Sequence, residues 1–463
     1  MSSSSSFYKK ALAIAVPIAL SQFFAGLLGV IDTLMVSRLG DNAIAAVGIS
    51  SNITFLMFMV NWGLLSGFGI FIAQYYGSKD LLNIHKVFLV VLVLSTMIAT
   101  FFFSIAFFAP DVLIGLYNNS DDLVNTPEVA RFGEAYLRIA SVSFVTITFT
   151  QMLSMLMRSV QDVVFPQMMQ IFVVFLNTGL NYLLINGNLG APALGVEGAA
   201  IATVSSSSVG LVLFIVYMFV SRNPVYRIRF SSVRLIDRVF LRRVFKKTLP
   251  VLLNETIWGL GMSAYLIAFG FISPLAVTSL TISNQVIGLI WFANGGLAAA
   301  TAIMLGHKLG ENALDDAKLY ASRFVRMNLT IGVLIGVVLF VFAPRIAGLY
   351  ESTSLEVQTN VTYFLRIFAV YLPIKFMNAL HIVGTLRSGG DTLYALFSEI
   401  GPLWLYGVPM VFILALFTQT PLYLILILIN VEELIKLVIL TIRYRSYRWI
   451  KNLTIDPLLA TTD

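Results

Sequence analysis

Residues 11–36 read ALAIAVPIALSQFFAGLLGVIDTLMV, an apolar run interrupted by one carboxylate, Asp32. A helix needs roughly 20 apolar residues to cross the hydrocarbon core of a bilayer, so this run is long enough to span a membrane. A carboxylate is costly in hydrocarbon, and one that is kept there marks a functional site by default. A second carboxylate, Glu255, lies in a similar apolar run later in the chain.

The composition extends this interpretation to the whole chain. Of 463 residues, 58% are hydrophobic and 11% are charged, and the mean hydropathy is +0.88. A soluble protein carries roughly 25% charged residues, so most of this chain is solvated by lipid. Lipid offers no partner for backbone N–H and C=O groups, which favours helices. The sequence predicts an all-α polytopic membrane protein with twelve transmembrane helices, approximately at 10–37, 42–76, 86–109, 132–157, 163–186, 197–221, 248–272, 275–306, 320–343, 358–386, 392–417 and 420–443.

Charged residues between the apolar runs predict the orientation. The segment 222–247 carries nine lysines and arginines against one acid, Asp237, and the tail after Arg443 is also basic. Loops rich in Lys and Arg stay in the cytoplasm. We therefore expect both termini in the cytoplasm, no cleavable signal peptide, and no nucleic-acid partner despite the net charge of +7.

The two halves of the sequence resemble each other. A loop of the form Arg-Ser-x-x-Asp occurs at Arg158–Asp162 and again at Arg387–Asp391. Proline, glycine and asparagine also recur at a constant shift, in the pairs Pro17/Pro250, Gly26/Gly259, Asn61/Asn294, Gly63/Gly296 and Gly77/Gly310. Because each half holds six spans, the two copies enter the membrane from the same side.

This duplication predicts the domain organisation. We expect two pseudo-symmetric lobes of six helices, an N-lobe at 1–221 and a C-lobe at 248–446. A basic cytoplasmic linker at 222–247 joins them, and 447–463 forms a cytoplasmic tail.

Several classes of chemistry are excluded by residue content. Cysteine is absent, and the three histidines lie too far apart in sequence to form a zinc-ligand motif. No glycine-rich nucleotide fingerprint occurs either. A polytopic membrane enzyme would need clustered His, Asp or Cys groups at one membrane face, so we expect no enzyme activity and no cofactor.

The duplicated six-helix half with its two Arg-Ser-x-x-Asp loops resembles the multidrug and toxic compound extrusion (MATE) family. So does the stretch Asp32-Thr33-Leu34-Met35-Val36-Ser37-Arg38-Leu39-Gly40 at the end of the first span. Thr385-Leu386-Arg387-Ser388-Gly389-Gly390-Asp391-Thr392 is also typical of that family. The resemblance covers roughly residues 10–446. It implies a secondary antiporter that exports drugs or metabolites and is driven by either Na⁺ or H⁺.

The resemblance also implies a cation site in the N-lobe. Family members place an acid at the position of Asp32 and an Asn-x-x-x-Asp pattern on the fifth span. Here the pattern ends in an amide, as Asn177 and Asn181, and Thr203 is the candidate from the sixth span. One carboxylate with two amide carbonyls can hold Na⁺, whereas a proton site built on two acids is disfavoured. The structural alternative for Asp32 is a cap or interface role, since it lies about 33 Å along the helix from Lys10.

A second branch of the family uses a glutamate on the seventh span, which Glu255 matches, with an acid on the tenth. The tenth span here carries Lys375, Asn378 and His381 instead. Glu255 is therefore a second candidate for cation coupling. Its structural alternative is a hydrogen bond to Asn284 or Gln285 on the next span.

Charged groups at or near the helix ends have expected roles as well. Lys375 is a possible gate through a bridge to Glu255, or its side chain snorkels outward. For Arg158, Asp162, Arg387 and Asp391, we expect helix capping and pairing at the cytoplasmic end, with gating as the alternative.

A substrate cavity for bulky cations would use aromatic rings and methionines. Packed or lipid-facing surface is the alternative for each such residue. The candidates for the cavity are Trp62, Met152, Met155, Trp258, Asn284, Gln285 and Asn378.

Taken together, the sequence predicts a cation-coupled antiporter for amphipathic organic cations or metabolites, acting by alternating access. We expect a monomer in a bacterial inner membrane, with lipid as its surroundings. A lipid-linked or polysaccharide flippase of the same superfamily is the alternative, disfavoured because membrane-embedded charges read as few and acidic. A channel is a further possibility, which the two-lobe duplication disfavours.

Overall fold

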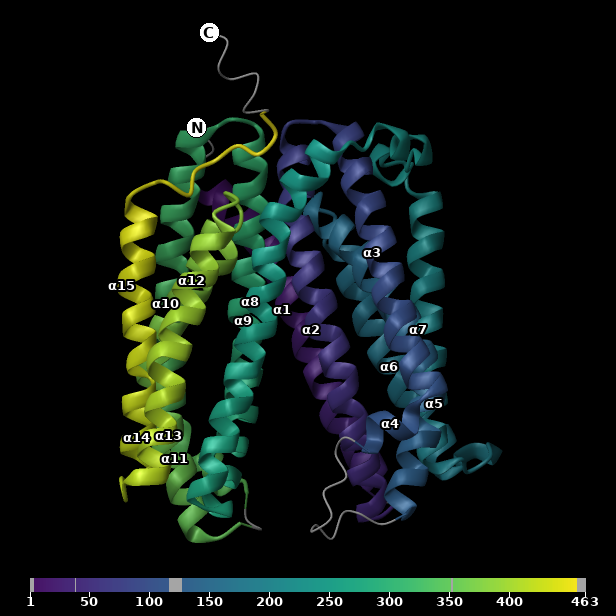
Figure 1. The fold of residues 1–463 in the computed structure, drawn as a ribbon, viewed down its shortest axis with the longest axis vertical. Helices are drawn as coiled ribbons and strands as arrows, with labels where there is room; N and C mark the ends of the chain where they lie inside the picture. Colours follow the sequence, from purple (N-terminus) through teal and green to yellow (C-terminus); the bar gives the residue numbers. More distant parts are fainter. Residues whose placement is uncertain (1–3, 38, 116–126, 351–352, 456–463) are drawn as a thin grey trace. The chain divides into compact units, whose positions relative to one another are not determined.

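The computed structural model describes residues 4–37, 39–115, 127–350 and 353–455 (Figure 1). These residues form helices, with no strand among them, which confirms the predicted all-α class. The long helices are α1 (Ser4–Ser37), α2 (Asp41–Gly77), α3 (Leu81–Phe108), α5 (Pro127–Ser159), α6 (Val164–Asn186), α7 (Gly195–Val220), α8 (Arg238–Ile272), α9 (Pro274–Gly310), α10 (Leu314–Gly348) and α11 (Leu355–Ala379).

The remaining spans are interrupted helices. The tenth span continues from α11 into a π-helical segment, η4 (Leu380–Leu386), and the eleventh joins α12 (Thr392–Pro402) to α13 (Val408–Phe417) through a second one, η5 (Leu403–Gly407). The twelfth consists of α14 (Leu422–Ile429) and α15 (Val431–Arg445). Eleven helices in the described ranges are long and apolar enough to cross a membrane. The broken twelfth span completes the predicted set, and π-helical turns within spans often mark functional sites.

Short elements connect these spans. They are α4 (Pro110–Gly115) and the single turns η1 (Asn188–Gly190), η2 (Pro224–Tyr226) and η3 (Phe230–Leu235). Local sequence explains several helix starts. Ser273 accepts a hydrogen bond from the backbone N–H of Ala276 at 3.1 Å, and Pro274 occupies the first helical position, where no N–H is needed.

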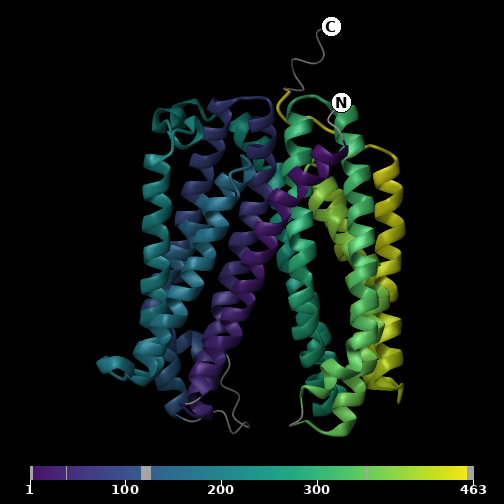
Figure 2. The ribbon, with the colours of Figure 1, turned by 180° about the vertical axis from the view of Figure 1, so that it is seen from behind.

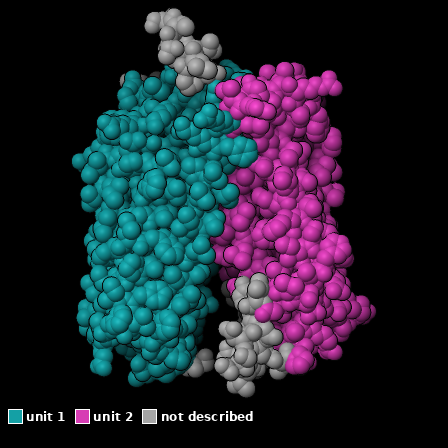
Figure 3. All heavy atoms as spheres, in the orientation of Figure 1, with its two compact units in different colours: residues 1–19, 73–80, 242–463 teal, residues 20–72, 81–241 magenta. Residues whose placement is uncertain are grey.

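The chain divides into two compact units (Figure 3). Unit 1 comprises residues 1–19, 73–80 and 242–463, and unit 2 comprises residues 20–72 and 81–241. The long helices α1, α2 and α8 therefore each contribute to both units. The lobe boundaries expected from the sequence remain a prediction.

In unit 2, helices α3, α5, α6 and α7 pack together, and Figure 2 shows them from behind in blue to teal. Small residues permit the close approach of α7, since a Cβ at Gly198 would meet the backbone of Leu184, and one at Gly210 would meet Val173. Ser21 of α1 donates a buried hydrogen bond to Gln167 of α6.

In unit 1, helices α9, α10, α11 and α15 pack together, and α12 packs on α15 (Figure 1). Gly332 and Gly336 of α10 lie against Pro373 and the backbone of Ala369 on α11. The repeat-related glycines Gly77 and Gly310 also meet here. A Cβ at Gly310 would overlap the carbonyl of Gln74, and one at Gly77 would overlap the carbonyl of His307. Glycine is therefore required at both positions by a backbone-to-backbone crossing.

Candidate functional site

Unit 2 gathers the polar residues expected to form a cation site. Asn181 donates from Nδ2 to Asp32 Oδ1 at 2.6 Å and to Asn177 Oδ1 at 3.0 Å. Asn177 donates in turn to the hydroxyl oxygens of Thr203 and Ser206, each at 3.3 Å. A chain of hydrogen bonds thus joins α1, α6 and α7.

Helix geometry explains this arrangement. Asn177 and Asn181 lie one turn apart on α6, and Thr203 and Ser206 lie three residues apart on α7, so each pair shares one helix face. Both asparagines are buried, with 3% and 1% of their surface exposed. Buried amides need partners, and the neighbouring polar groups supply most of them.

The cluster is rich in oxygen and poor in charge. Asn181 Oδ1 is buried without a hydrogen-bond partner among the described residues. One carboxylate, two amide carbonyls and a hydroxyl are ligands that a hard cation accepts. With one carboxylate among neutral oxygens, this donor set suits a monovalent cation. In the described part of the chain, no group of three or more His, Cys, Asp or Glu is placed to hold a metal ion.

One neighbour of this cluster escaped the sequence analysis. The hydroxyl of Tyr136 on α5 lies within hydrogen-bonding reach of Thr203 and close to Asp32. A tyrosine in an apolar helix gives no sequence signal of its own, and only the packing of α5 on α7 brings it here.

In unit 1, Glu255 pairs with a residue that the sequence placed elsewhere. Arg387 Nη1 lies 2.7 Å from Glu255 Oε1, and Arg387 is only 3% exposed. Arg387 Nη2 lies 4.0 Å from Glu399 Oε2, and Asn254 donates to the same carboxylate oxygen. The site around Glu255 is therefore an acid–base–acid arrangement across α8, the loop after η4, and α12.

This pairing corrects three expectations. The partner of Glu255 is Arg387 rather than Lys375, Asn284 or Gln285; the last two side chains are exposed. Lys375 lies 5.0 Å from the ring centroid of Phe368 instead. Arg387 directly follows the last residue of η4, and its side chain is buried there.

The other loop residues make separate contacts. Asp391 accepts from Arg443 at 2.6 and 3.0 Å and from Lys451 at 3.3 Å. Its repeat partner Asp162 accepts from Tyr217 at 2.8 Å and Tyr226 at 2.5 Å. Arg158 lies over the ring of Trp62, 5.8 Å from the centroid, rather than beside an acid.

A group of charged residues on α15 was missed by the sequence analysis. Lys436 Nζ lies 3.2 Å from Glu432 Oε1 and 3.5 Å from Glu433 Oε1. Asn378 donates to Glu433 Oε2 at 2.7 Å and to its carbonyl at 2.9 Å. The expectation that embedded charges are few and acidic is therefore wrong. The signal was present as Glu432, Glu433 and Lys436 in the middle of the last apolar run, 420–443.

The residues expected to line a substrate cavity do not share one environment. Met152 and Met155 are buried, at 2% and 5% exposed, whereas Asn284 and Gln285 are exposed. Trp62 stacks on Phe58 with a centroid distance of 6.0 Å. Trp258 packs against an apolar cluster of unit 1, and Asn378 belongs to the α15 group.

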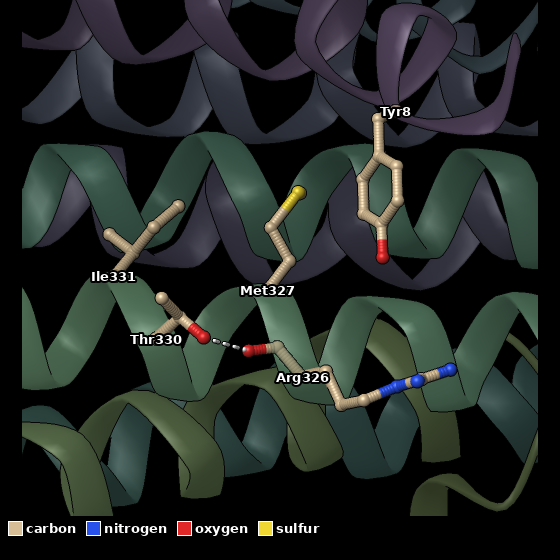
Figure 4. Close-up of a pocket in the computed structure, with 5 residues that line it drawn as sticks. All are labelled: Tyr8, Arg326, Met327, Thr330 and Ile331. Carbon is tan, nitrogen blue, oxygen red and sulfur yellow. Dashed lines mark hydrogen bonds between the residues drawn. The ribbon is translucent and has the colours of Figure 1, made fainter. Parts of the chain in front are cut away.

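A shallow pocket in unit 1 contains none of these residues. It has a volume of about 250 Å³ and is lined by Tyr8, Arg326, Met327, Thr330 and Ile331 (Figure 4). Thr330 donates to the carbonyl of Arg326, so its hydroxyl is engaged within α10.

Solved structures share this fold. A MATE transporter crystallised in complex with MaL6 has a TM-score of 0.85 at 20% identity, covering 95% of this chain and 97% of that one. A transporter of the MOP superfamily from Pyrococcus furiosus, described as having a binding pocket of reverse polarity, also scores 0.85 at 20% identity over 97% of each chain.

Curated bacterial proteins are similar in sequence along most of their length. The uncharacterized transporter YisQ of Bacillus subtilis is 23% identical over 425 residues, which is 92% of this chain and 91% of YisQ. The multidrug resistance protein MdtK of Pectobacterium atrosepticum is 24% identical, covering 88% of each chain. The MatE family model matches residues 17–183 and 250–413, one segment in each half of the sequence. The chain belongs to the MatE family of membrane transporters, which includes the multidrug and toxic compound extrusion proteins.

Proposed function

We propose that the protein is an Na⁺-coupled antiporter that exports amphipathic organic cations by alternating access. The observation that carries the proposal is the oxygen cluster of unit 2, in which Asp32 is joined to Asn181 at 2.6 Å and Asn181 to Asn177 at 3.0 Å. A single acid surrounded by neutral oxygen donors favours a monovalent metal cation over a shared proton. Multidrug transport by relatives such as MdtK supports the substrate class.

Coupling follows from competition for one charge. The carboxylate of Asp32 can neutralise either Na⁺ or a cationic substrate. In a site of low dielectric constant it does not hold both at once, so binding of Na⁺ displaces the substrate. Because each ligand stabilises the conformation that it binds better, the Na⁺ gradient favours release of substrate on the outer face. We place the protein in a bacterial inner membrane as a monomer, with both termini in the cytoplasm.

Efflux from proteoliposomes tests this proposal. Vesicles loaded with ethidium receive a Na⁺ gradient or a proton gradient separately, with the wild-type protein or Asp32→Asn. We expect Na⁺-driven efflux in the wild type and its loss in the variant. Matched controls are Asp111→Asn and Asp237→Asn, which remove carboxylates outside the cluster. An efflux rate that depends on neither gradient would support a channel.

A lipid-linked flippase remains the second candidate, since unit 1 holds the embedded basic residues Arg387, Lys436 and Lys375. Two of them, however, are paired with glutamates, which leaves little positive charge for a phosphate. Scrambling of a fluorescent phospholipid or polyprenyl phosphate without a cation gradient would favour this candidate.

A further inference from the structure

The middle of the last span of unit 1 carries three charged residues, Glu432, Glu433 and Lys436, where a membrane helix normally carries none. The helix breaks at Asn430, whose side chain donates to the carbonyl of Leu426 at 2.7 Å, and α15 begins directly after it. Glu432 and Lys436 are 5% and 3% exposed, and the side chain of Glu433 is 13% exposed. Such groups are costly inside a membrane unless they are paired or functional.

The pairing on α15 is incomplete. Glu432 and Glu433 share one ammonium group, that of Lys436, at 3.2 and 3.5 Å. Glu433 has a second partner in Asn378, but the Oε2 atom of Glu432 has no aligned hydrogen-bond partner among the described residues. A buried carboxylate oxygen without an aligned donor is costly in free energy, so its environment needs an explanation.

The Oε2 atom of Glu432 faces the hydroxyl of Tyr265, and the two atoms lie within reach of each other without an aligned hydrogen bond. Tyr265 of α8 is 8% exposed, and its hydroxyl has no aligned partner within the described ranges, although it lies within reach of Glu432. Both atoms lie against Gly407 in η5, where a Cβ would overlap them. The glycine thus provides the space in which the hydroxyl and the carboxyl group meet.

The charges of the surrounding network do not balance when all its members are ionised. Glu399 interacts with Arg387 on one side and with Lys436 on the other, which connects α15 to Glu255. With Lys375 the network holds four carboxylates, Glu255, Glu399, Glu432 and Glu433, and three cations, Arg387, Lys436 and Lys375. With all members ionised the network carries one net negative charge, which one additional positive charge would balance.

We propose that Glu432 is a proton-exchange site of unit 1, with Tyr265 as the hydrogen-bond partner of its Oε2 atom. In the loaded state a proton from water binds Oε2, and the resulting O–H donates to the Tyr265 oxygen. In the empty state the proton returns to water, and the Tyr265 hydroxyl donates to the carboxylate. No other bond changes.

The surroundings favour a proton over a metal cation. Lys436 lies 3.2 Å from the other oxygen of the same carboxylate, and Lys375 is also close enough to interact. A metal cation at Oε2 would be repelled by both ammonium groups in a medium of low dielectric constant. A proton neutralises the acid without leaving a separate charge beside them.

The charged and titratable groups around Glu432 come from every neighbouring element. They are Tyr265 from α8, Lys375 from α11, Tyr406 from η5, Glu399 from α12, and Glu433 and Lys436 from α15. Of these, Tyr265 alone faces the free oxygen together with Gly407. This distinguishes Glu432 from Glu433, whose Oε2 atom is already bonded by Asn378.

The inference goes beyond the proposed Na⁺ coupling at Asp32, and the protonation of Glu432 is measurable without transport. Purified full-length protein in nanodiscs is titrated from alkaline pH down to about pH 6, where exposed Asp and Glu side chains stay ionised, and is followed by infrared difference spectroscopy in the carboxylic-acid C=O region. The wild type should gain one such band, and Glu432→Gln should lose it. Glu433→Gln is the matched control and should retain it.

Two further variants keep the test decisive. Tyr265→Phe preserves every charge and should shift the band to the position of an acid without a hydrogen bond. Asp32→Asn should retain the band even when efflux is lost, which separates this inference from the proposed function. A band that persists in Glu432→Gln, or that disappears in Glu433→Gln alone, would overturn the proposal. So would a band that Na⁺ abolishes at constant pH.

Discussion

Arg387 Nη1 lies 2.7 Å from Glu255 Oε1 although 132 residues separate them, and the arginine is almost completely buried. The pair joins the loop after the tenth span to the seventh span of unit 1. The guanidinium of Arg387 is thus paired with the carboxylate of Glu255, which the sequence suggested as a site for a coupling cation. The repeat partner Arg158 lies over the ring of Trp62 instead, and Gln22 matches Glu255 at the shift that pairs Pro17 with Pro250.

Removal of Arg387 should destabilise unit 1. In Arg387→Met, Glu255 loses its ion pair in a buried environment, and breaking one partner of such a pair costs about 3–5 kcal/mol. The expected result is a clear fall in the thermal unfolding midpoint of the detergent-solubilised protein, measured by intrinsic fluorescence.

The double variant Glu255→Gln with Arg387→Met is the control for this prediction. It removes both charges and should recover part of the lost stability, since position 255 no longer carries an unpaired charge. If the single and double variants unfolded at the same temperature, the ion pair would not be the source of the effect.

A second acid in the unit 2 cluster should change its ion preference. In Asn181→Asp, the new carboxylate lies beside that of Asp32. Two like charges at that separation favour binding of a proton by one of them. We expect efflux to depend more on pH and less on Na⁺. Rates measured at several pH values, with and without Na⁺, test this. An unchanged Na⁺ dependence would contradict the assignment of Asn181 to the site.

The contact between Glu432 and Tyr265 requires glycine at position 407. Gly407→Ala would place a methyl group on both oxygens, and overpacking of this kind costs about 1–3 kcal/mol. We expect a lower unfolding temperature and loss of the carboxylic-acid infrared band. Gly401→Ala is the matched control in α12, because no atom lies within 4 Å of the added carbon. Equal effects of the two substitutions would refute this account.

The C-terminal segment should depend on a second glycine. Trp449 is fully buried, and its carbonyl would overlap a Cβ at Gly389, in the loop that carries Arg387 and Asp391. Gly389→Ala should therefore displace residues 447–455 and increase their amide hydrogen exchange. Gly348→Ala, where the added carbon meets nothing within 4 Å, should leave the exchange of this segment unchanged.

Much of the fold follows from sequence because lipid imposes long apolar helices. Hydropathy alone predicts the spans, and the recurrence of Gly77 as Gly310 marks a crossing that the structure places between two helix ends. The residues of the unit 2 cluster could be predicted because Asn177 and Asn181 have the same four-residue spacing as the Asn-x-x-x-Asp pattern of the family.

The partners within unit 1 could not be named in this way. Arg387 follows an apolar span and precedes Ser-Gly-Gly-Asp, a composition typical of an exposed loop, and only the packing of that loop directs the side chain inward. Glu432 and Lys436 are hidden among leucines and isoleucines, and their pairing with Tyr265 and Glu399 depends on contacts between distant segments.

The most direct test of the central claim is the binding of Na⁺ to the purified protein, measured by isothermal titration calorimetry at constant pH in the wild type and in Asp32→Asn. We predict saturable binding to the wild type and none to the variant, with both proteins folded by size-exclusion chromatography. Equal Na⁺ binding by the two proteins would show that the carboxylate of Asp32 does not hold the coupling ion.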